Sequence, residues 1–172
     1  MKYKFIFSIA VCSLVLSGFF WESKNHRVEN IMTERDWEMK VVTIIPPKYQ
    51  ERAFGDVNQI SINAELSFSA DGTYQRLTRM QLQSHLSSEQ SDLLITDSGI
   101  WKVKGGYLLM SPIDFQSGEP TNDASTRSQT EVIKQFYRME TQQSREIQFV
   151  NERTLLLSGI GLSSIVLTAR SS

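Results

Sequence analysis

Residues 59–69 alternate strictly between polar and apolar side chains, and this pattern constrains the fold more than any other feature of the chain. The apolar positions are Ile60, Ile62, Ala64, Leu66 and Phe68. A period of two places successive side chains on opposite faces, so the pattern predicts a β-strand with one buried face. Asp71-Gly72 follows, a dipeptide that tolerates the left-handed backbone of a tight turn, and residues 73–83 form the predicted returning strand.

The returning strand carries an arginine on its apolar face. Tyr74, Thr78, Met80 and Leu82 share one side of this strand, and Arg76 falls on the same side. Either a bulge shifts the phase of the strand, or Arg76 points into the interior. We favour the bulge, or a position of Arg76 at the rim of the sheet.

The period of two recurs along the rest of the chain. Further strands are predicted at residues 37–43, 93–103, 107–115, 145–150, 154–158 and 164–169. The first ends before Pro46-Pro47, and the second is bent at Gly99. Gly105-Gly106 turns the chain into the third, on which Tyr107, Leu109 and Ile113 share one side.

One amphipathic helix is predicted between the fifth and sixth strands. Its apolar stripe consists of Val132, Ile133, Phe136 and Tyr137. Ser128 and Glu131 form a plausible capping pair. About eight antiparallel strands, joined mostly by short turns, are the number that closes into a small barrel. We therefore predict a mainly β fold, a lipocalin-like antiparallel barrel with one inserted helix; a two-sheet sandwich is the alternative.

An uninterrupted apolar run over residues 5–21 follows a basic tip that carries Lys2 and Lys4. As a helix, a run of about 17 residues reaches about 25 Å, just enough to cross a bilayer core. The lysines favour an N-terminus in the cytoplasm and the rest of the chain outside it. We predict a cytoplasmic tip at residues 1–4, a transmembrane anchor at 5–21, a stalk or short helix at 22–34 and an exported β-barrel domain at 35–172.

Aromatic residues mark the ends of this run. The anchor residues that we single out are Phe5, Phe19, Phe20 and Trp21, the last three as an interfacial belt. A cleaved signal peptide is the alternative, because residues 15–17 offer the spacing that a signal peptidase needs. A lipoprotein signal at Cys12 is disfavoured, since Val11 stands where a small residue is needed and the apolar run continues beyond the cysteine.

Composition and motifs argue against catalysis and against nucleic-acid binding. Two of the 18 basic residues lie in the tip, so the exported part, which holds all 19 acidic residues, lacks the basic face that nucleic acid requires. Cys12 leaves no thiol outside the apolar run, and neither His26 nor His85 has a second histidine at a ligand spacing. No Gly-x-Ser-x-Gly motif and no nucleotide-binding glycine loop is present. We predict no enzyme activity, no metal and no cofactor.

A ligand pocket is the alternative to chemistry. The candidate pocket residues are Trp37, Phe68, Tyr74, Arg76 and Trp101. Aromatic side chains suit flat apolar ligands, although core packing is the simpler interpretation of the four aromatic residues among them. Glu65 and Asp97 are placed to approach each other across strands, but we prefer to interpret them as parts of a solvated charged face.

Polar motifs flank the predicted strand at residues 145–150. Met139-Glu140-x-Gln142-Gln143-Ser144-Arg145 leads into it, and Val150-Asn151-Glu152-Arg153-Thr154 follows. Earlier motifs are Thr33-x-Arg35-x-Trp37, Asp71-Gly72-Thr73-Tyr74-x-Arg76 and Gly99-x-Trp101. In this combination the chain resembles the ToxS family over nearly its whole length.

The resemblance implies a single-pass protein of the inner membrane without catalytic activity. Its periplasmic domain is expected to bind that of the transcription activator ToxR as a heterodimer, to protect ToxR from proteolysis and to promote its activity on virulence and porin genes, without touching DNA itself. Bile-acid sensing is also implied, with the steroid face expected against Trp101 and the carboxylate near Arg76. Candidate partner contacts are Arg145, Glu152 and Arg153. An autonomous lipocalin-like carrier of a small apolar ligand is the alternative function.

Overall fold

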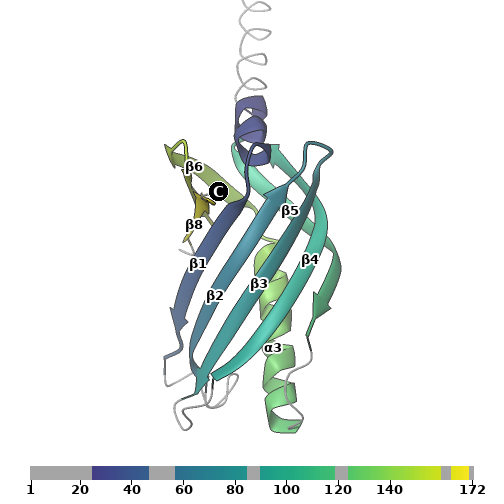
Figure 1. The fold of residues 1–172 in the computed structure, drawn as a ribbon, viewed down its shortest axis with the longest axis vertical. Coiled ribbons are helices and arrows are strands. Elements are labelled where there is room, and N and C mark those ends of the chain that lie inside the picture. The colour runs from purple at the N-terminus through teal and green to yellow at the C-terminus, as the bar shows by residue number, and fades with distance from the viewer. Residues whose placement is uncertain (1–24, 47–56, 85–89, 119–123, 160–163, 171–172) are drawn as a thin grey trace, which may run out of the picture.

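Eight antiparallel strands close into a barrel, as the alternation predicts. The structure is a computed structural model that describes residues 25–46, 57–84, 90–118, 124–159 and 164–170. The strands, in barrel order, are β1 (Trp37–Ile44), β2 (Val57–Phe68), β3 (Thr73–Ser84), β4 (Gln90–Lys104), β5 (Tyr107–Ser117), β6 (Arg145–Asn151), β7 (Thr154–Ser158) and β8 (Ser164–Ala169). Helix α3 (Ala124–Thr141) is inserted between β5 and β6, and β8 returns to pair with β1 (Figure 1).

The predicted anchor at residues 5–21 lies outside the described residues. Among the described residues, no helix is both long and apolar enough to cross a bilayer.

The β2–β3 hairpin forms at the predicted Asp71-Gly72 turn. Gly72 adopts a φ of 84°, a left-handed backbone that glycine adopts without strain. The Asp71 carboxylate accepts hydrogen bonds from the backbone N–H and the hydroxyl of Thr73, at 2.9 and 2.6 Å. The turn therefore holds the register in which the apolar faces of both strands point into the barrel.

The preferred interpretation of Arg76, a bulge or a rim position, is wrong. β2 and β3 stay in regular register from residue 59 to residue 68, and their only irregularity lies between Val57 and Gln59. Arg76 is buried and points inward. The physical reason lies on the next strand, where Asp97 stands directly opposite Arg76 and supplies a buried counter-charge.

A bulge does occur on β5, where the chain passes Gly99 of β4. Gly99 pairs with Pro112 and Ser98 pairs with Asp114, so Ile113 is the extra residue and is exposed. Before this bulge Leu108 and Met110 are buried, whereas Tyr107 is exposed. The face predicted to carry both Tyr107 and Ile113 is therefore the outer face of β5, and the bulge interrupts it between these two residues.

A short helix at residues 25–33 packs against the start of β1 (Figure 1). Val28 and Met32 are buried in the same core cluster as Trp37, whose indole N–H donates to the Met32 carbonyl at 3.0 Å. This cluster also contains Phe68, Tyr74 and Trp101 of β2, β3 and β4. The helix and these aromatic side chains together fill one part of the barrel.

A second core cluster includes two side chains of α3, Ile133 and Tyr137. The other half of the predicted helical stripe is exposed, because Val132 and Phe136 turn toward solvent. The predicted capping pair is also wrong: α3 begins at Ala124, which places Ser128 inside the helix.

The backbone of β5 leaves no room for a side chain at Gly99 of β4. A Cβ at this position would lie 2.1 Å from the Ser111 carbonyl oxygen and 2.8 Å from the Pro112 Cα, both backbone atoms that cannot turn aside. We expect Gly99→Ala to destabilise the fold by about 1–3 kcal/mol or more. Gly118→Ala is the matched control, since its Cβ would meet only ordinary contact at 3.7 Å. Urea unfolding followed by tryptophan fluorescence measures both, and equal stabilities would contradict this explanation of the bulge.

Candidate functional site

A buried ion pair lies on the inner face of the barrel wall. The Arg76 guanidinium donates to both carboxylate oxygens of Asp97, from Nε to Oδ1 at 2.8 Å and from Nη2 to Oδ2 at 2.9 Å. Both side chains are almost fully buried, at 7% and 0% exposure. This two-point geometry is the strongest arrangement that an arginine and a carboxylate adopt, and it compensates part of the cost of removing both charges from water.

Neighbouring hydroxyl groups complete the pair. Tyr74 donates to Asp97 Oδ2 at 2.8 Å, so the carboxylate accepts three hydrogen bonds. Burial, reinforced by the Asp97 charge, raises the pKa of Tyr74 above its ordinary value, which keeps the phenol protonated as a donor.

Arg76 also joins the barrel wall to α3. Its Nη2 donates to the Thr141 hydroxyl at 2.7 Å, and that hydroxyl donates to the Tyr137 carbonyl at 2.9 Å. The guanidinium lies 4.8 Å from the centre of the Tyr137 ring, whose hydroxyl is hydrogen-bonded to Thr78. A cation is favoured at this position because the last turn of a helix carries partial negative charge.

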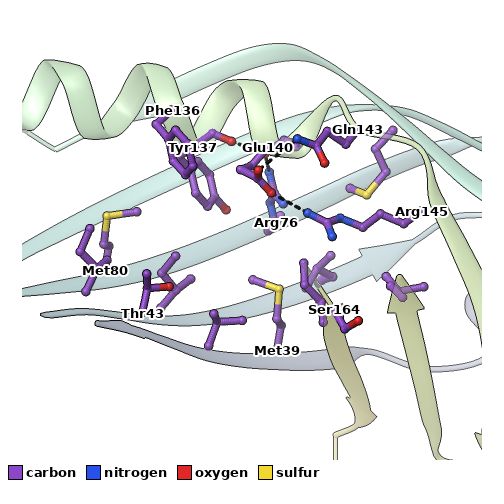
Figure 2. A pocket seen from close by; sticks show the side chains of 18 of the residues that line it. Met39, Thr43, Arg76, Met80, Phe136, Tyr137, Glu140, Gln143, Arg145 and Ser164 are labelled. Carbon is purple, nitrogen blue, oxygen red and sulfur yellow. Dashed lines mark hydrogen bonds and ion pairs between the residues drawn. The ribbon is translucent and has the colours of Figure 1, made fainter. Parts of the chain in front are cut away.

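A second charged pair joins the last turn of α3 to the first residue of β6. Arg145 Nη2 donates to Glu140 Oε2 at 2.8 Å, and Gln143 Nε2 donates to Glu140 Oε1 at 3.0 Å. Figure 2 shows Arg76, Glu140, Gln143 and Arg145 gathered at one end of a pocket, with Thr43 and Met80 away from them.

These polar groups border a cavity of about 590 Å³. Its other walls are mainly apolar and come from both core clusters, for example Met39, Leu66 and Leu108 from the first and Ile60, Met80 and Ile133 from the second. Exposed Thr43, Phe136 and Ser164 also line it, so the cavity reaches solvent beside α3. Cavities of this size and polarity accommodate a drug-sized or steroid-sized ligand.

The cavity includes only one of the predicted pocket residues. Arg76 lines it, whereas Trp37, Phe68, Tyr74 and Trp101 are not among its lining residues and pack in the first core cluster. Phe68 and Trp101 contact edge to face at 5.0 Å, and the Trp101 indole donates to the Ser69 carbonyl. A ligand in this cavity therefore does not reach Trp101, and the charge of Arg76 is already matched by Asp97.

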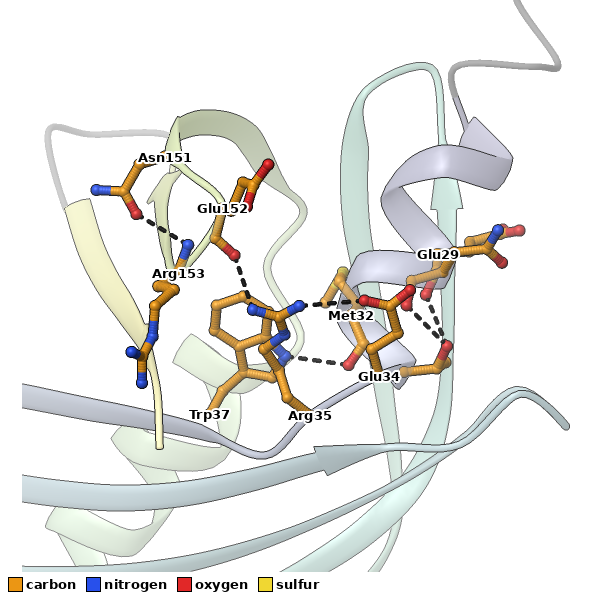
Figure 3. Close-up of polar contacts among 10 residues, drawn as sticks. Glu29, Met32, Glu34, Arg35, Trp37, Asn151, Glu152 and Arg153 are labelled. Atoms are coloured by element: carbon orange, nitrogen blue, oxygen red, sulfur yellow. Dashed lines mark hydrogen bonds and ion pairs between the residues drawn. The ribbon is translucent and has the colours of Figure 1, made fainter. Parts of the chain in front are cut away.

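The predicted partner contacts separate into two places. Arg145 is buried and lines the cavity, while Glu152 and Arg153 are exposed in the β6–β7 turn. Figure 3 shows this turn beside the start of β1, where Arg35 donates to the Glu152 carbonyl at 3.1 Å. Two motifs far apart in sequence, around Arg35 and around Glu152, thus meet at one end of the barrel.

The barrel is weakest at the seam between β5 and β6. Only Tyr107–Glu146 and Leu108–Arg145 pair across it, whereas every other neighbouring pair of strands shares at least three residue pairs. Exposed apolar side chains lie on both strands, but the antiparallel register takes them apart from the paired positions in opposite directions: Ile113 on β5, and Phe149 and Val150 on β6. Helix α3 also carries exposed apolar side chains, namely Val132, Phe136 and Met139.

Several residues of the site escaped sequence reasoning. The interpretation of Asp97 as part of a solvated charged face is wrong, because Asp97 is 1% exposed and pairs with Arg76. Glu65 is exposed and pairs with Arg170 at 2.6 Å. The position of Asp97 in the inward phase of β4, together with an inward Arg76, was the available signal. Nothing in the sequence pattern indicated Glu140 or Gln143 as cavity residues, because they follow from how α3 docks.

Comparison with known proteins finds matches along nearly the whole chain. A family model described as "Trans-membrane regulatory protein ToxS" matches residues 20–168. The chain is 31% identical over 165 residues to the transmembrane regulatory protein ToxS of Vibrio cholerae serotype O1, covering 95% of both chains. It is 30% identical over 169 residues to the protein of the same name from Vibrio parahaemolyticus, covering 97% of this chain and 98% of the relative.

The buried pair predicts strongly non-additive mutations. Asp97→Asn leaves the Arg76 charge buried without its counter-charge, and we expect it to cost about 3–5 kcal/mol of unfolding free energy. The double substitution Arg76→Met, Asp97→Leu removes both charges and is expected to cost less than the sum of Arg76→Met and Asp97→Leu. Urea unfolding of the wild type, Arg76→Met, Asp97→Leu and the double variant measures this difference. Additive single effects would show that the two groups do not depend on each other.

Proposed function

Because this chain belongs to the ToxS family of transmembrane regulatory proteins, we propose that it is a non-enzymatic, membrane-anchored partner of the transcription activator ToxR. Residues 5–21 anchor it in the inner membrane, and the barrel lies in the periplasm. There it binds the periplasmic domain of ToxR as a heterodimer, protects it from proteolysis and promotes its activity on virulence and porin genes.

The observation that carries this proposal is the β5–β6 seam. Beyond Leu108, β5 has no strand partner on the side of β6, and among the described residues the backbone beyond Ile147 of β6 likewise has none on the side of β5. The β5 edge lies beside α3, whose Arg138 is 4.9 Å from the centre of the Phe115 ring. The end of β6, which carries exposed Phe149 and Val150, is an unpaired strand edge of the kind that another protein covers. Met139 on α3, the helix that leads into β6, is 62% exposed.

Linkage explains how such a partner regulates. A protein that binds only the folded ToxR domain lowers the population of its unfolded, protease-sensitive state. The gain is about 2.7 kcal/mol when the effective concentration is a hundred times the dissociation constant. Two proteins held in one membrane reach high effective concentrations without tight intrinsic affinity.

The cavity supports the ligand part of the proposal. Its size and mainly apolar walls suit the rigid apolar body of a bile acid, and a bile acid bound there strengthens the complex with ToxR. An autonomous carrier of a small apolar ligand is the second candidate function, favoured by the same cavity. A carrier binds its ligand equally well with and without ToxR, which separates the two.

A substitution on α3 tests the partner surface. We expect Met139→Lys to weaken ToxR binding about tenfold or more, because a charge would be buried without a partner. Protease half-life of ToxR co-reconstituted with the full chain measures the effect. Leu77→Lys on the outer face of β3 is the control, since Leu77 is also exposed but lies away from the seam. Equal protection by both variants would remove the seam as the interface.

The β6–β7 turn provides a separate test. We expect Arg153→Glu to weaken ToxR binding, more at low than at high salt, because the Arg153 side chain is exposed. The turn itself stays intact, since it is the Arg153 backbone that bonds to Asn151 and Ala169. Arg79→Glu, the same charge change at an exposed position of β3, is the control. Unchanged affinity of Arg153→Glu across salt concentrations would exclude the turn from the interface.

A further inference from the structure

Strands β1 and β8 separate where both still border the cavity. They pair at three positions, from Trp37 to Met39 of β1, and among the described residues β1 then continues to Ile44 without a strand partner on this side. Figure 1 shows β1 extending well beyond β8. The separated parts of both strands line the cavity, with Val41 on β1 and Ile165 on β8. The hydrogen-bonded wall of the barrel is therefore interrupted between these two strands.

The exposure of inward-facing side chains locates an opening in this gap. Along the inner face of β1, Met39 is buried and Thr43 is exposed, although both line the cavity. Ile45, two residues further on, lines the cavity and is buried again. Ser164 at the start of β8 and Phe136 on α3 are exposed lining residues on the other borders of the opening. We call this opening, bordered by Thr43, Ser164 and Phe136, the mouth.

The charged groups that line the cavity are already paired. Arg76 is held at two points by Asp97, and Arg145 is paired with Glu140. Among the described residues that line the cavity, Arg76, Glu140 and Arg145 carry the formal charges, and each has its counter-charge within 3 Å. An anion that approached Arg76 would also meet the Asp97 carboxylate, so the interior gives an anionic group no net attraction. An acidic group inside would lose its water without compensation.

We propose that the mouth is the entrance of the cavity, and that a bile acid lies with its ring system inside and its acidic tail in the mouth. This inference rests on the ligand part of the proposed function and adds the direction in which the ligand lies. The ring system loses water and packs against side chains such as Ile60 and Met80, while the carboxylate stays hydrated beside Thr43 and Ser164. This direction differs from the sequence-based expectation, which placed the carboxylate near Arg76.

Tags at the two ends of one ligand test the direction. Tritiated deoxycholate, below its micellar concentration, is bound to nanodiscs that hold the full chain with ToxR, and nanodiscs without protein give the background. One competitor carries fluorescein on the carboxyl group through a lysine, whose own carboxylate keeps the negative charge. We expect it to compete within about threefold of deoxycholate, because its tag stays in solvent.

The second competitor carries the same tag on the ring hydroxyl farthest from the carboxyl group. We expect it to compete at least about tenfold more weakly, because the tag would have to displace packed side chains inside the barrel. Equal competition by the two tagged compounds, or the reverse order, would overturn the proposed direction.

Substitutions at the mouth test where the ligand enters. We expect Thr43→Trp to slow association of the carboxyl-tagged compound at least about tenfold, since the indole narrows the opening. Stopped-flow fluorescence anisotropy measures the rate. Val42→Trp is the matched control, because Val42 is 63% exposed on the other face of the same strand and does not line the cavity. Ser164→Trp repeats the test from the border on β8, so the result does not depend on the folding of one variant. Wild-type association rates in the folded mouth variants would overturn the assignment of the entrance.

The partner role is measured separately in the same nanodiscs. Absence of binding by deoxycholate and both tagged compounds would overturn this inference and the ligand part of the proposed function together. Protection of ToxR from protease without added ligand tests the partner part alone. Binding of deoxycholate with the wrong order of the tagged compounds would overturn the inference and leave the proposed ligand function intact.

Discussion

The Arg76–Asp97 pair divides the interior of this barrel into two apolar regions. Along the inward face of β3, Tyr74 belongs to one core cluster and Met80 to the other, and the two residues between them are Arg76 and Thr78. Two buried charges cannot be covered by apolar side chains, so the packing on each side has to stop at them. Because Arg76 also reaches Thr141, the same pair fixes where the last turn of α3 lies against the wall. Loss of either charge would therefore disturb the strands and the helix together.

The barrel is filled around the helix at residues 25–33, whereas the cavity lies between the two core clusters. Around the helix at residues 25–33, Trp37, Phe68 and Trp101 occupy the interior with large rings. The cavity-lining residues of both clusters are mostly aliphatic or methionine, and α3 covers the space without filling it. Methionine is flexible and adapts to ligands of different shape, so Met39 and Met80 make this wall tolerant rather than selective.

Local patterns were enough to predict the strands, the Asp71-Gly72 turn, the inserted helix and the barrel. These local patterns failed where the position of a residue depends on its partner in another strand or helix. Arg76 violates the period of β3, and its partner Asp97 is 21 residues away on β4, so the rule that favours a bulge could not weigh the pair. The bulge lies instead at Ile113 of β5. There the β5 backbone comes so close to Gly99 that a Cβ would not fit. The cavity depends on the docking of α3, which explains why the aromatic residues of the predicted pocket do not line it.

Helix α3 borders both proposed sites. Ile133 and Tyr137 face the cavity, while Met139 on the same helix is exposed to solvent. A ligand that packs against one side of the helix stabilises its position, and a partner that binds the other side needs that position. If each favours the same position, then each strengthens the binding of the other by the same factor, because coupling between two sites is reciprocal. On this basis ToxR should raise the affinity of the cavity for its ligand as much as the ligand raises the affinity for ToxR.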